Sequence, residues 1–274
     1  MKFDFKLVGK VGSMALINRE RNDLDYNVIA NISRELEPGM IWVTSGATEI
    51  GRLDYIKRNN VELKGAKDEN KADYAAQGQS ILMQTYRQYV DEKYSLRQVL
   101  VEHVHFNDAE KLNNLKKMFL RCPAQKAIPI VNYNDAVCYE ENRRLEIQLL
   151  KAQRDNVVQG IDNDETAALI ATLVKAETLL ILTAVDGIYA DPTDAGTLIS
   201  EISGKDAYEL IEGIDAAKER CKGASRTGAA GAKAKLEFIK APAKLGTKVI
   251  IANSRFKISE ILSGKVPCTV IGIR

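Results

Sequence analysis

The sequence is poor in the residues that build metal, redox or disulfide sites. Its four cysteines stand at positions 122, 138, 221 and 268, and no two of them have the close spacing of a zinc site or a redox motif. The two histidines, His103 and His105, fall in an alternating run that predicts a strand at residues 98–104. Both would point to one face of that strand, and a His-x-His pair can ligate a metal, but no third ligand is evident. We therefore expect no metal site built by the protein itself.

Long apolar runs and an excess of one charge are missing as well. No stretch approaches the roughly 18 unbroken apolar residues of a membrane span, and residues 1–6 carry charges where a signal peptide needs an apolar run. The 39 lysines and arginines face 37 acidic residues, so the formal net charge is only +2 and provides no basic field for nucleic acid. These absences predict a cytoplasmic protein with neither a membrane nor a nucleic acid as partner.

What the chain does contain is an alternation of short apolar runs with longer helical patterns. Hydrophobic residues make up 45% of its 274 residues, which is enough for a full core. Strands are predicted at residues 6–11, 40–43, 98–104, 127–131, 178–183, 248–252 and 269–271, and helices at 27–36, after 43, at 71–93, after a cap at Asn107 or Asp108, and near 165. Two charged stretches, 57–71 and 138–160, lack a core stripe and are interpreted either as loops or as mobile elements near a site. Strands separated by helices favour an α/β fold with a mostly parallel sheet covered on both faces.

Small and polar residues gather where the predicted strands end, and open parallel sheets bind ligands at those ends. The segments are Lys10-Val-Gly12-Ser13, Thr44-Ser45-Gly46-Ala47, Asn132-Tyr133-Asn134-Asp135, Asp162-Asn163-Asp164, the run from Thr183 to Pro192, and a small-residue loop from Gly228 to Lys235. Singly, each has a structural explanation: the glycines suit tight turns, Asp162 with Glu165 forms a capping box, and Asp191-Pro192 opens turns. Together they supply backbone N–H groups, cations and a positioned acceptor, which is what phosphoryl transfer needs.

The motifs of two large phosphate-handling classes are absent, because neither a Gly-x-x-x-x-Gly-Lys-[Ser/Thr] loop nor the set of protein-kinase motifs occurs. In their order and spacing the segments instead resemble the amino-acid kinase superfamily, and glutamate 5-kinases in particular, over nearly the whole chain. The matching motifs are Lys10-x-Gly12-Ser13, Ser45-Gly46-Ala47 with Gly51-Arg52, Ala75-Ala76-x-Gly78-Gln79, Asn132-x-Asn134-Asp135, Asp162-Asn163-Asp164 and Leu182-Thr183 through Asp191-Pro192. The combination is fairly specific, whereas any one motif is not.

The resemblance implies a three-layer αβα sandwich and a role for each matching residue. Lys10 and Lys235 would be catalytic cations that stabilise the transferring phosphoryl group, and Asp164 would orient them. The nucleotide, ATP with Mg²⁺ on its phosphates, would lie against Lys10, Gly12, Ser13, Thr183, Asp186, Tyr189, Asp191, Pro192, Gly228, Gly231 and Lys235. A small acidic substrate, glutamate, would be held by Ser45, Gly46, Ala47, Asn134, Asp135, Asp162 and Asn163.

The resemblance also bears on organisation. It implies one domain over residues 1–274, with an acceptor-binding lobe at residues 1–175 and a nucleotide-binding lobe at residues 176–274. It further implies a homo-oligomer, and we expect no counterpart of the C-terminal PUA domain that many glutamate 5-kinases carry.

Four departures from the family's pattern leave other functions open. Tyr133 replaces the usual glutamate between two asparagines, Ile161 replaces a glycine, Ala184 replaces an aspartate, and the loop from Gly228 to Lys235 lacks both hydroxyl residues and offers Lys233 as a second candidate cation. The alternatives are a relative with another acceptor, such as aspartate, carbamate, a phosphonate or a nucleoside monophosphate, and a member that binds nucleotide or amino acid without turnover. Because Tyr133 removes a carboxylate, we expect glutamate to bind weakly, with Asp135 as the remaining partner of its ammonium group.

Overall fold

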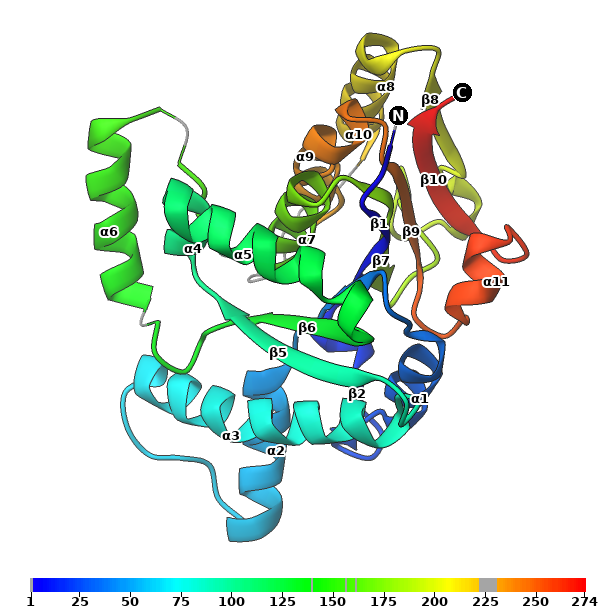
Figure 1. Cartoon of the computed structure of the whole chain (residues 1–274). Coiled ribbons are helices and arrows are strands. Elements are labelled where there is room, and N and C mark those ends of the chain that lie inside the picture. The colour runs from blue at the N-terminus through cyan, green and yellow to red at the C-terminus, as the bar shows by residue number, and fades with distance from the viewer. Residues whose placement is uncertain (1, 139, 156, 161, 222–230) are drawn as a thin grey trace.

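Eight strands form one sheet in which the first strand of the chain lies near the centre. The computed structural model describes residues 2–138, 140–155, 157–160, 162–221 and 231–274. Within them the strand order is β5-β6-β4-β1-β7-β9-β10-β8, and every neighbouring pair is parallel except β9 with β10. The strands are β1 (Phe5–Val11), β4 (Met40–Val43), β5 (Ser95–Val101), β6 (Ala127–Tyr133), β7 (Ala176–Thr183), β8 (Glu201–Gly204), β9 (Lys248–Asn253) and β10 (Cys268–Ile273), and β2 (Ile17–Asn18) pairs separately with β3 (Asp23–Leu24). The predicted mostly parallel sheet is confirmed (Figure 1).

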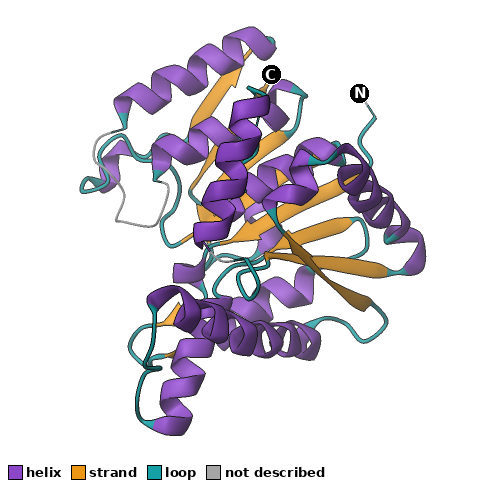
Figure 2. Ribbon diagram, turned by 90° about the vertical axis from the view of Figure 1, so that its left-hand side faces the viewer, coloured by secondary structure: helices purple, strands orange, loops and turns teal. Residues whose placement is uncertain are grey.

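Helices cover both faces of this sheet, which gives the three layers that were predicted (Figure 2). The helices are α1 (Tyr26–Glu35), α2 (Ala47–Asn59), α3 (Lys67–Tyr89), α4 (His103–Asn107), α5 (Ala109–Arg121), α6 (Glu140–Gln153), α7 (Asn163–Leu173), α8 (Ala207–Arg220), α9 (Ala232–Phe238), α10 (Lys240–Lys244) and α11 (Ile258–Leu262). One core lies between the sheet and helices α5, α7, α8, α9 and α10, and the other lies between the sheet and α1, α3 and α11.

The central strands are apolar on both sides because each side faces one of these cores. In β7, Leu179 and Ile181 belong to the first core, whereas Leu180 and Leu182 belong to the second. All four side chains are fully buried. Such continuous apolar runs are typical of parallel strands covered by helices on both faces.

The strand order separates the two halves of the sequence. Strands β5, β6, β4 and β1 come from residues before 134, and β7, β9, β10 and β8 come from residues after 175. The two groups meet where β1 pairs in parallel with β7. The division into two lobes with separate ligands stays a prediction.

The structure corrects the sequence-based assignment of three segments. The strand predicted at residues 98–104 runs from Ser95 to Val101, because Val101 pairs with Tyr133, the last residue of β6. His103 and His105 therefore lie in helix α4 rather than on one face of a strand. The two charged stretches, for which a loop was one interpretation, are partly helical, since α2 extends to Asn59, α3 begins at Lys67, and α6 occupies most of the second stretch.

Helices α2 and α3 approach each other at two glycines, and this contact positions the loop after β4. A Cβ on Gly51 would lie 1.8 Å from the carbonyl oxygen of Tyr74, and a Cβ on Gly78 would lie 1.8 Å from that of Ala47. Neither separation is possible for a real side chain. Ala47 is the first residue of α2, and the N-cap Gly46 has a positive φ of 94°, which favours glycine. The resemblance motifs Gly51-Arg52 and Gly78-Gln79 thus have a packing role.

Among the described residues, no helix combines the length and the apolar character that crossing a bilayer requires.

Candidate functional site

The carboxyl ends of β1, β4, β6 and β7 meet around a cavity of about 940 Å³. These strands run parallel, so their ends lie at one edge of the sheet and bring together segments far apart in the sequence. The predicted site residues on the cavity wall are Lys10, Gly12, Ser13, Ser45, Gly46, Ala47, Asp135, Asp162, Asn163, Asp164, Thr183 and Lys235. The cavity therefore unites most of the residues that the sequence singled out.

A buried carboxylate joins two lysines at the centre of this cavity. Asp164 Oδ1 lies 2.6 Å from Lys10 Nζ, and Asp164 Oδ2 lies 2.8 Å from Lys235 Nζ. The Asp164 side chain is 1% exposed, and those of Lys10 and Lys235 are 8% and 18% exposed. Burial by itself would raise the pKa of the Asp164 carboxyl, but the charges of Lys10 and Lys235 hold that pKa below its usual range. Asp164 is thus a carboxylate at neutral pH that fixes two ammonium groups side by side.

Local structure at the start of α7 sets the position of Asp164. Asp162 is the N-cap residue, and its Oδ1 accepts a hydrogen bond of 2.8 Å from the backbone N–H of Asp164. Asp164 is therefore in the first turn, where the helix dipole favours a negative charge. The bonds differ from those of the predicted capping box, because Asp162 accepts from Asp164, the second residue of the helix, and the Glu165 carboxylate accepts from the N–H of Gly160.

The amide of Asn163 ties the ends of three elements together. Its Nδ2 donates to the carbonyl oxygen of Thr44 at 3.0 Å, to Ser45 Oγ at 2.9 Å and to Asn132 Oδ1 at 3.1 Å. Asn132 Nδ2 in turn donates to Gln79 Oε1 at 2.9 Å. This network links the loop after β4, the end of β6 and helix α3, so the side of the cavity predicted for the acceptor is built as one unit.

The same side of the cavity carries an ion pair that the sequence did not reveal. Lys71 Nζ of α3 lies 3.4 Å from Asp135 Oδ1, and both residues line the cavity. Glu49 and Gln159 also line it and were missed, because neither belongs to a recognisable motif. Asn134, which was predicted to hold the substrate, is not on the cavity wall. Its Nδ2 donates to Glu102 Oε1 at 2.7 Å.

The predicted nucleotide-binding residues divide into two groups. Lys10, Gly12, Ser13, Thr183 and Lys235 line the cavity. The N–H of Gly12 donates to the carbonyl oxygen of Leu182 at 3.2 Å, and the contact of Gly12 and Ser13 with phosphate stays a prediction. Asp186, Tyr189, Asp191, Pro192 and Gly231 are not on its wall, and Gly228 and Ile161 lie outside the described residues.

Two of the residues off the wall have structural partners. Asp186 Oδ1 accepts from Asn253 Nδ2 and from Arg255 Nη2, and Asp191 Oδ1 accepts from the N–H of Thr193 within a turn. The nucleotide-binding role of this segment stays a prediction.

The second candidate cation, Lys233, differs from Lys235 in its surroundings. Lys233 is exposed and does not line the cavity, whereas Lys235, two positions further along α9, forms the ion pair with Asp164. A helix separates residues two positions apart by about 200°, so the two lysines point to opposite sides of α9.

Tyr133 does not face the acceptor, contrary to the expectation from the sequence. Successive residues of a strand point to opposite sides, and Asn132 is the one that lines the cavity. The Tyr133 hydroxyl lies 3.1 Å from Cys138 Sγ, and the Arg143 guanidinium lies 5.5 Å from its ring centre. Tyr133 therefore packs behind the site, under α6.

The histidines do not form a metal site. His103 is fully buried with Nε2 3.0 Å from Glu146 Oε2, and burial lowers its pKa. His105 Nδ1 instead accepts from the N–H of Glu102 in the first turn of α4. Among the described residues, no group of three or more His, Cys, Asp and Glu side chains is placed to hold a metal ion.

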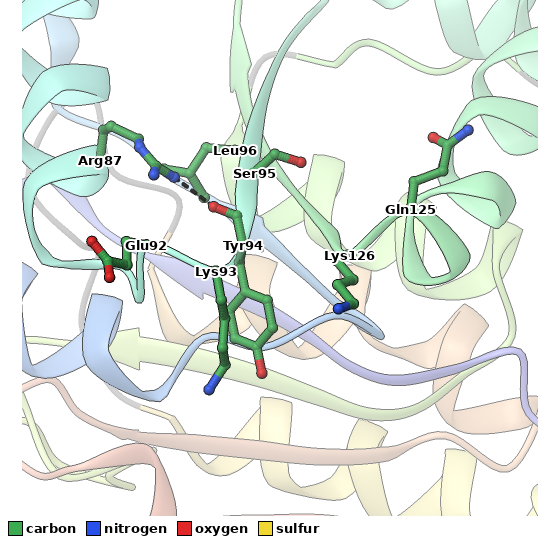
Figure 3. Close-up of a pocket in the computed structure, with 8 residues that line it drawn as sticks. All are labelled: Arg87, Glu92, Lys93, Tyr94, Ser95, Leu96, Gln125 and Lys126. Carbon is green, nitrogen blue, oxygen red and sulfur yellow. Dashed lines mark hydrogen bonds between the residues drawn. The ribbon is translucent and has the colours of Figure 1, made fainter.

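A second hollow, of about 500 Å³, lies near the starts of β5 and β6, and Figure 3 shows the residues that line it. It lies beside the start of β5 and is lined in part by Arg87, Lys93 and Lys126. Arg87 Nη1 donates to the carbonyl oxygen of Tyr94 at 2.6 Å, and Lys93 Nζ lies 2.7 Å from Asp91 Oδ2. Two of its cations thus already have partners, and it contains none of the residues predicted to bind ligands.

Two lysines are fixed at the carboxyl end of a parallel sheet, and a separate network of polar side chains lies beside them. A phosphoryl-transferring enzyme needs such cations near a place where the acceptor can bind. The model of the amino acid kinase family matches residues 6–253. A glutamate 5-kinase of Clostridium perfringens is 30% identical over 259 residues, which cover 93% of this chain and 87% of that protein. Glutamate 5-kinase 1 of Bacillus licheniformis is 31% identical over 284 residues, which cover 97% of this chain and 69% of that protein.

Solved structures of other kinases share the fold. Carbamate kinase from Giardia lamblia bound to AMP-PNP has a TM-score of 0.59 at 16% identity and covers 98% of both chains. UMP kinase from Ureaplasma parvum has a TM-score of 0.55 at 13% identity, with 98% of this chain and 99% of that chain covered. At such identities the likeness shows the fold alone.

The chain belongs to the amino acid kinase family. This confirms the resemblance found in the sequence motifs. Membership of a kinase family, with relatives that are named as kinases, supports a phosphotransferase that uses ATP and usually a Mg²⁺ ion.

Proposed function

We propose that the protein transfers the γ-phosphoryl group of ATP to the side-chain carboxylate of glutamate, and that it acts in the cytoplasm as a homo-oligomer. A carboxylate oxygen attacks the γ-phosphorus, the bond from that phosphorus to the β,γ-bridging oxygen breaks, and ADP leaves with the electron pair. ATP supplies the phosphoryl group, with Mg²⁺ carried on its phosphates. The relatives named as glutamate 5-kinases support glutamate as the acceptor.

The observation that carries the proposal is the arrangement of Lys10, Asp164 and Lys235. Negative charge builds up on the equatorial oxygens of the γ-phosphoryl group and on the bridging oxygen during transfer. Two ammonium groups, held 2.6 and 2.8 Å from one carboxylate, can stabilise that negative charge. Because Asp164 holds them before the substrates arrive, little reorganisation is needed at the moment of transfer.

The state of Asp164 also limits the kind of acceptor. Both of its oxygens are engaged by lysines and its side chain is 1% exposed, so Asp164 is a poor general base. A hydroxyl acceptor would have to lose a proton. A side-chain carboxylate has an ordinary pKa of about 4.3 and is already ionised at neutral pH. The site therefore favours an acceptor that is an anion from the start.

The test is a panel of acceptors with ATP and Mg²⁺, in which ADP release is followed and hydroxylamine traps any acyl phosphate as a hydroxamate. Glutamate should give ADP and hydroxamate in equal amounts, and aspartate, carbamate and UMP should give little. If another acid supports turnover while glutamate does not, the acceptor is misassigned and only the family membership stands. Nucleotide binding without ADP release for any acid would instead favour a member without turnover.

The non-catalytic alternative has less support than the enzymatic one. Its sequence basis is Ala184 together with the small residues of the loop before Lys235. Ala184 does line the cavity, but both lysines and Asp164 keep the geometry that phosphoryl transfer needs. A protein that only binds has no need for this buried arrangement.

A further inference from the structure

The cavity contains a third lysine that neither the motifs nor the proposed reaction uses. Among the described residues on the cavity wall, the lysines are Lys10, Lys71 and Lys235. Lys10 and Lys235 are held by Asp164, whereas Lys71 pairs with Asp135. Lys71 is therefore the lysine of this wall that is not held by Asp164, and it lies next to the Asp135 carboxylate. The wall also carries the carboxylates of Glu49, which pairs with Arg52, and of Asp162 and Glu165.

The ion pair of Lys71 and Asp135 has a longer N–O distance and is more exposed to solvent than the central ion pairs. Its N–O distance is 3.4 Å, against 2.6 and 2.8 Å at Asp164, and the side chains of Lys71 and Asp135 are 44% and 25% exposed. Exposed ion pairs contribute little to folding stability. Both groups thus remain able to turn toward a ligand in the cavity at small cost.

The backbone that carries Lys71 is held firmly. Lys71 is in the second turn of α3, and its neighbours Ala72 and Ala75 are buried. Helix α3 is also fixed against α2 by the close contact at Gly78. On the other side of the cavity, the network of Asn132 and Asn163 fixes the end of β6, which leads into Asp135. The backbone of Lys71 is therefore part of a packed helix, and Asp135 lies in the turn that directly follows β6.

We propose that Lys71 binds the α-carboxylate of the acceptor, next to Asp135, the residue already expected to hold its ammonium group, so that the two side chains form a clamp for the α-amino acid end. The inference rests on the proposed function, since it assumes an amino acid as acceptor. Adjacent groups of opposite charge in the cavity match the adjacent ammonium and carboxylate of a zwitterion. The distal carboxylate then extends toward Lys10 and Lys235. Lys71 is on this view a specificity residue for amino acids with a free α-carboxylate.

The same charges disfavour other acidic acceptors. Carbamate and nucleoside monophosphates have no ammonium group that could pair with Asp135. Asp135 would then either face the negative charge of such an acceptor or stay paired with Lys71, which would no longer be available to that acceptor. A partly exposed, charge-assisted contact of Lys71 should change the apparent affinity for glutamate by about 10- to 100-fold.

The test replaces Lys71 by methionine, which keeps the length of the side chain and removes the charge. Lys67→Met is the matched control, because Lys67 is one turn earlier on α3, is exposed and does not line the cavity. The steady-state parameters are measured for glutamate and for 4-aminobutyrate, which is glutamate without its α-carboxylate. Lys71→Arg is included because it restores the charge.

We expect Lys71→Met to raise the KM for glutamate about 10- to 100-fold with little change in kcat. The values for 4-aminobutyrate should be unchanged, Lys71→Arg should recover most of the affinity, and Lys67→Met should match the parent. A merely structural role would instead lower kcat or weaken both acceptors equally, and either result overturns the clamp. If 4-aminobutyrate is not turned over by the parent, the KM effect with glutamate and its rescue by arginine decide the matter.

The failure of the clamp and the failure of the proposed function give different results. An active parent with an unchanged KM in Lys71→Met overturns the clamp alone. A parent that releases no ADP in response to glutamate overturns the proposed function, and the clamp with it, before any variant is made.

Discussion

Replacing Asp164 by asparagine removes one charge at the centre of the site and almost no volume. In the parent, the Asp164 carboxylate contacts Lys10 Nζ at 2.6 Å and Lys235 Nζ at 2.8 Å. The asparagine amide keeps one acceptor oxygen, but its NH₂ group faces the second ammonium. We expect the two lysines to move apart and to lose the geometry in which both reach the transferring phosphoryl group.

The magnitudes for activity and stability differ. Loss of one well-placed cation contact at developing charge costs about 10²–10³ in kcat, or about 2.7–4 kcal/mol. For stability, two ion pairs are lost, and two ammonium groups that are only 8% and 18% exposed are left without a counter-charge. This cost exceeds the relief of no longer burying a carboxylate, so we expect the free energy of unfolding to fall by about 3–5 kcal/mol. The variant should be folded and slow.

The assay combines denaturant unfolding, initial rates of ADP release, and ATP binding by calorimetry. ATP should bind the variant at least as well as the parent, because the two ammonium groups without a counter-charge attract phosphate. Asp162→Ala is the control: it removes the N-cap bond to Asp164 N–H and should cost about 1 kcal/mol of stability. Full activity in a folded Asp164→Asn protein would refute the catalytic interpretation and leave Asp164 as part of a helix start.

Three further predictions concern the same elements. Lys10→Ala should lower kcat by about 10²–10³ in a protein that is less stable than the parent but still folded, and unchanged turnover would exclude Lys10 from the site. Lys235→Ala should be inactive and Lys233→Ala active, because only Lys235 contacts Asp164; the reverse result would mean that the lysine was misassigned. Gly51→Ala should lower the free energy of unfolding by about 1–3 kcal/mol because its Cβ would meet Tyr74 O at 1.8 Å. Gly213→Ala in α8, where the nearest atom is 3.4 Å away, should be neutral or stabilising, and equal effects in the two variants would refute the packing argument.

Much of the fold follows from the sequence because the pattern of the central strands is simple. Strand β4 lies at the predicted residues 40–43, and β7 and β9 differ from their predictions by one or two residues at an end. Their side chains are buried on both faces, so the apolar runs have clear limits. The edge of the sheet is less clear, since β5 has mostly half-exposed side chains and its predicted position was wrong. The short strand β8 has no apolar run and was not predicted.

The candidate site was predictable where the chemistry is local in sequence. Lys10, the segment after β4, and residues 162–164 are next to strand ends or a helix start, and the structure brings them together around the cavity. Lys71 was not predictable in this way. It is in the second turn of a long helix, and only the packing of α3 against α2 places it beside Asp135. Tyr133 was misjudged for the opposite reason, because a motif fixes the position of a residue but the strand decides which side it faces.

The cost of the central ion pairs argues for a function rather than a structural role. Lys10 comes from β1 in the first half of the sheet, and Lys235 comes from α9 near the end of the chain. Asp164 joins them from α7, so the arrangement exists only when all three elements are in place. Burying three charges requires desolvation, and a well-packed apolar group at such a position is often equally or more stabilising. A chain selected for stability alone has no reason to place a carboxylate and two ammonium groups at the open end of its sheet, where negative charge on a ligand can be met.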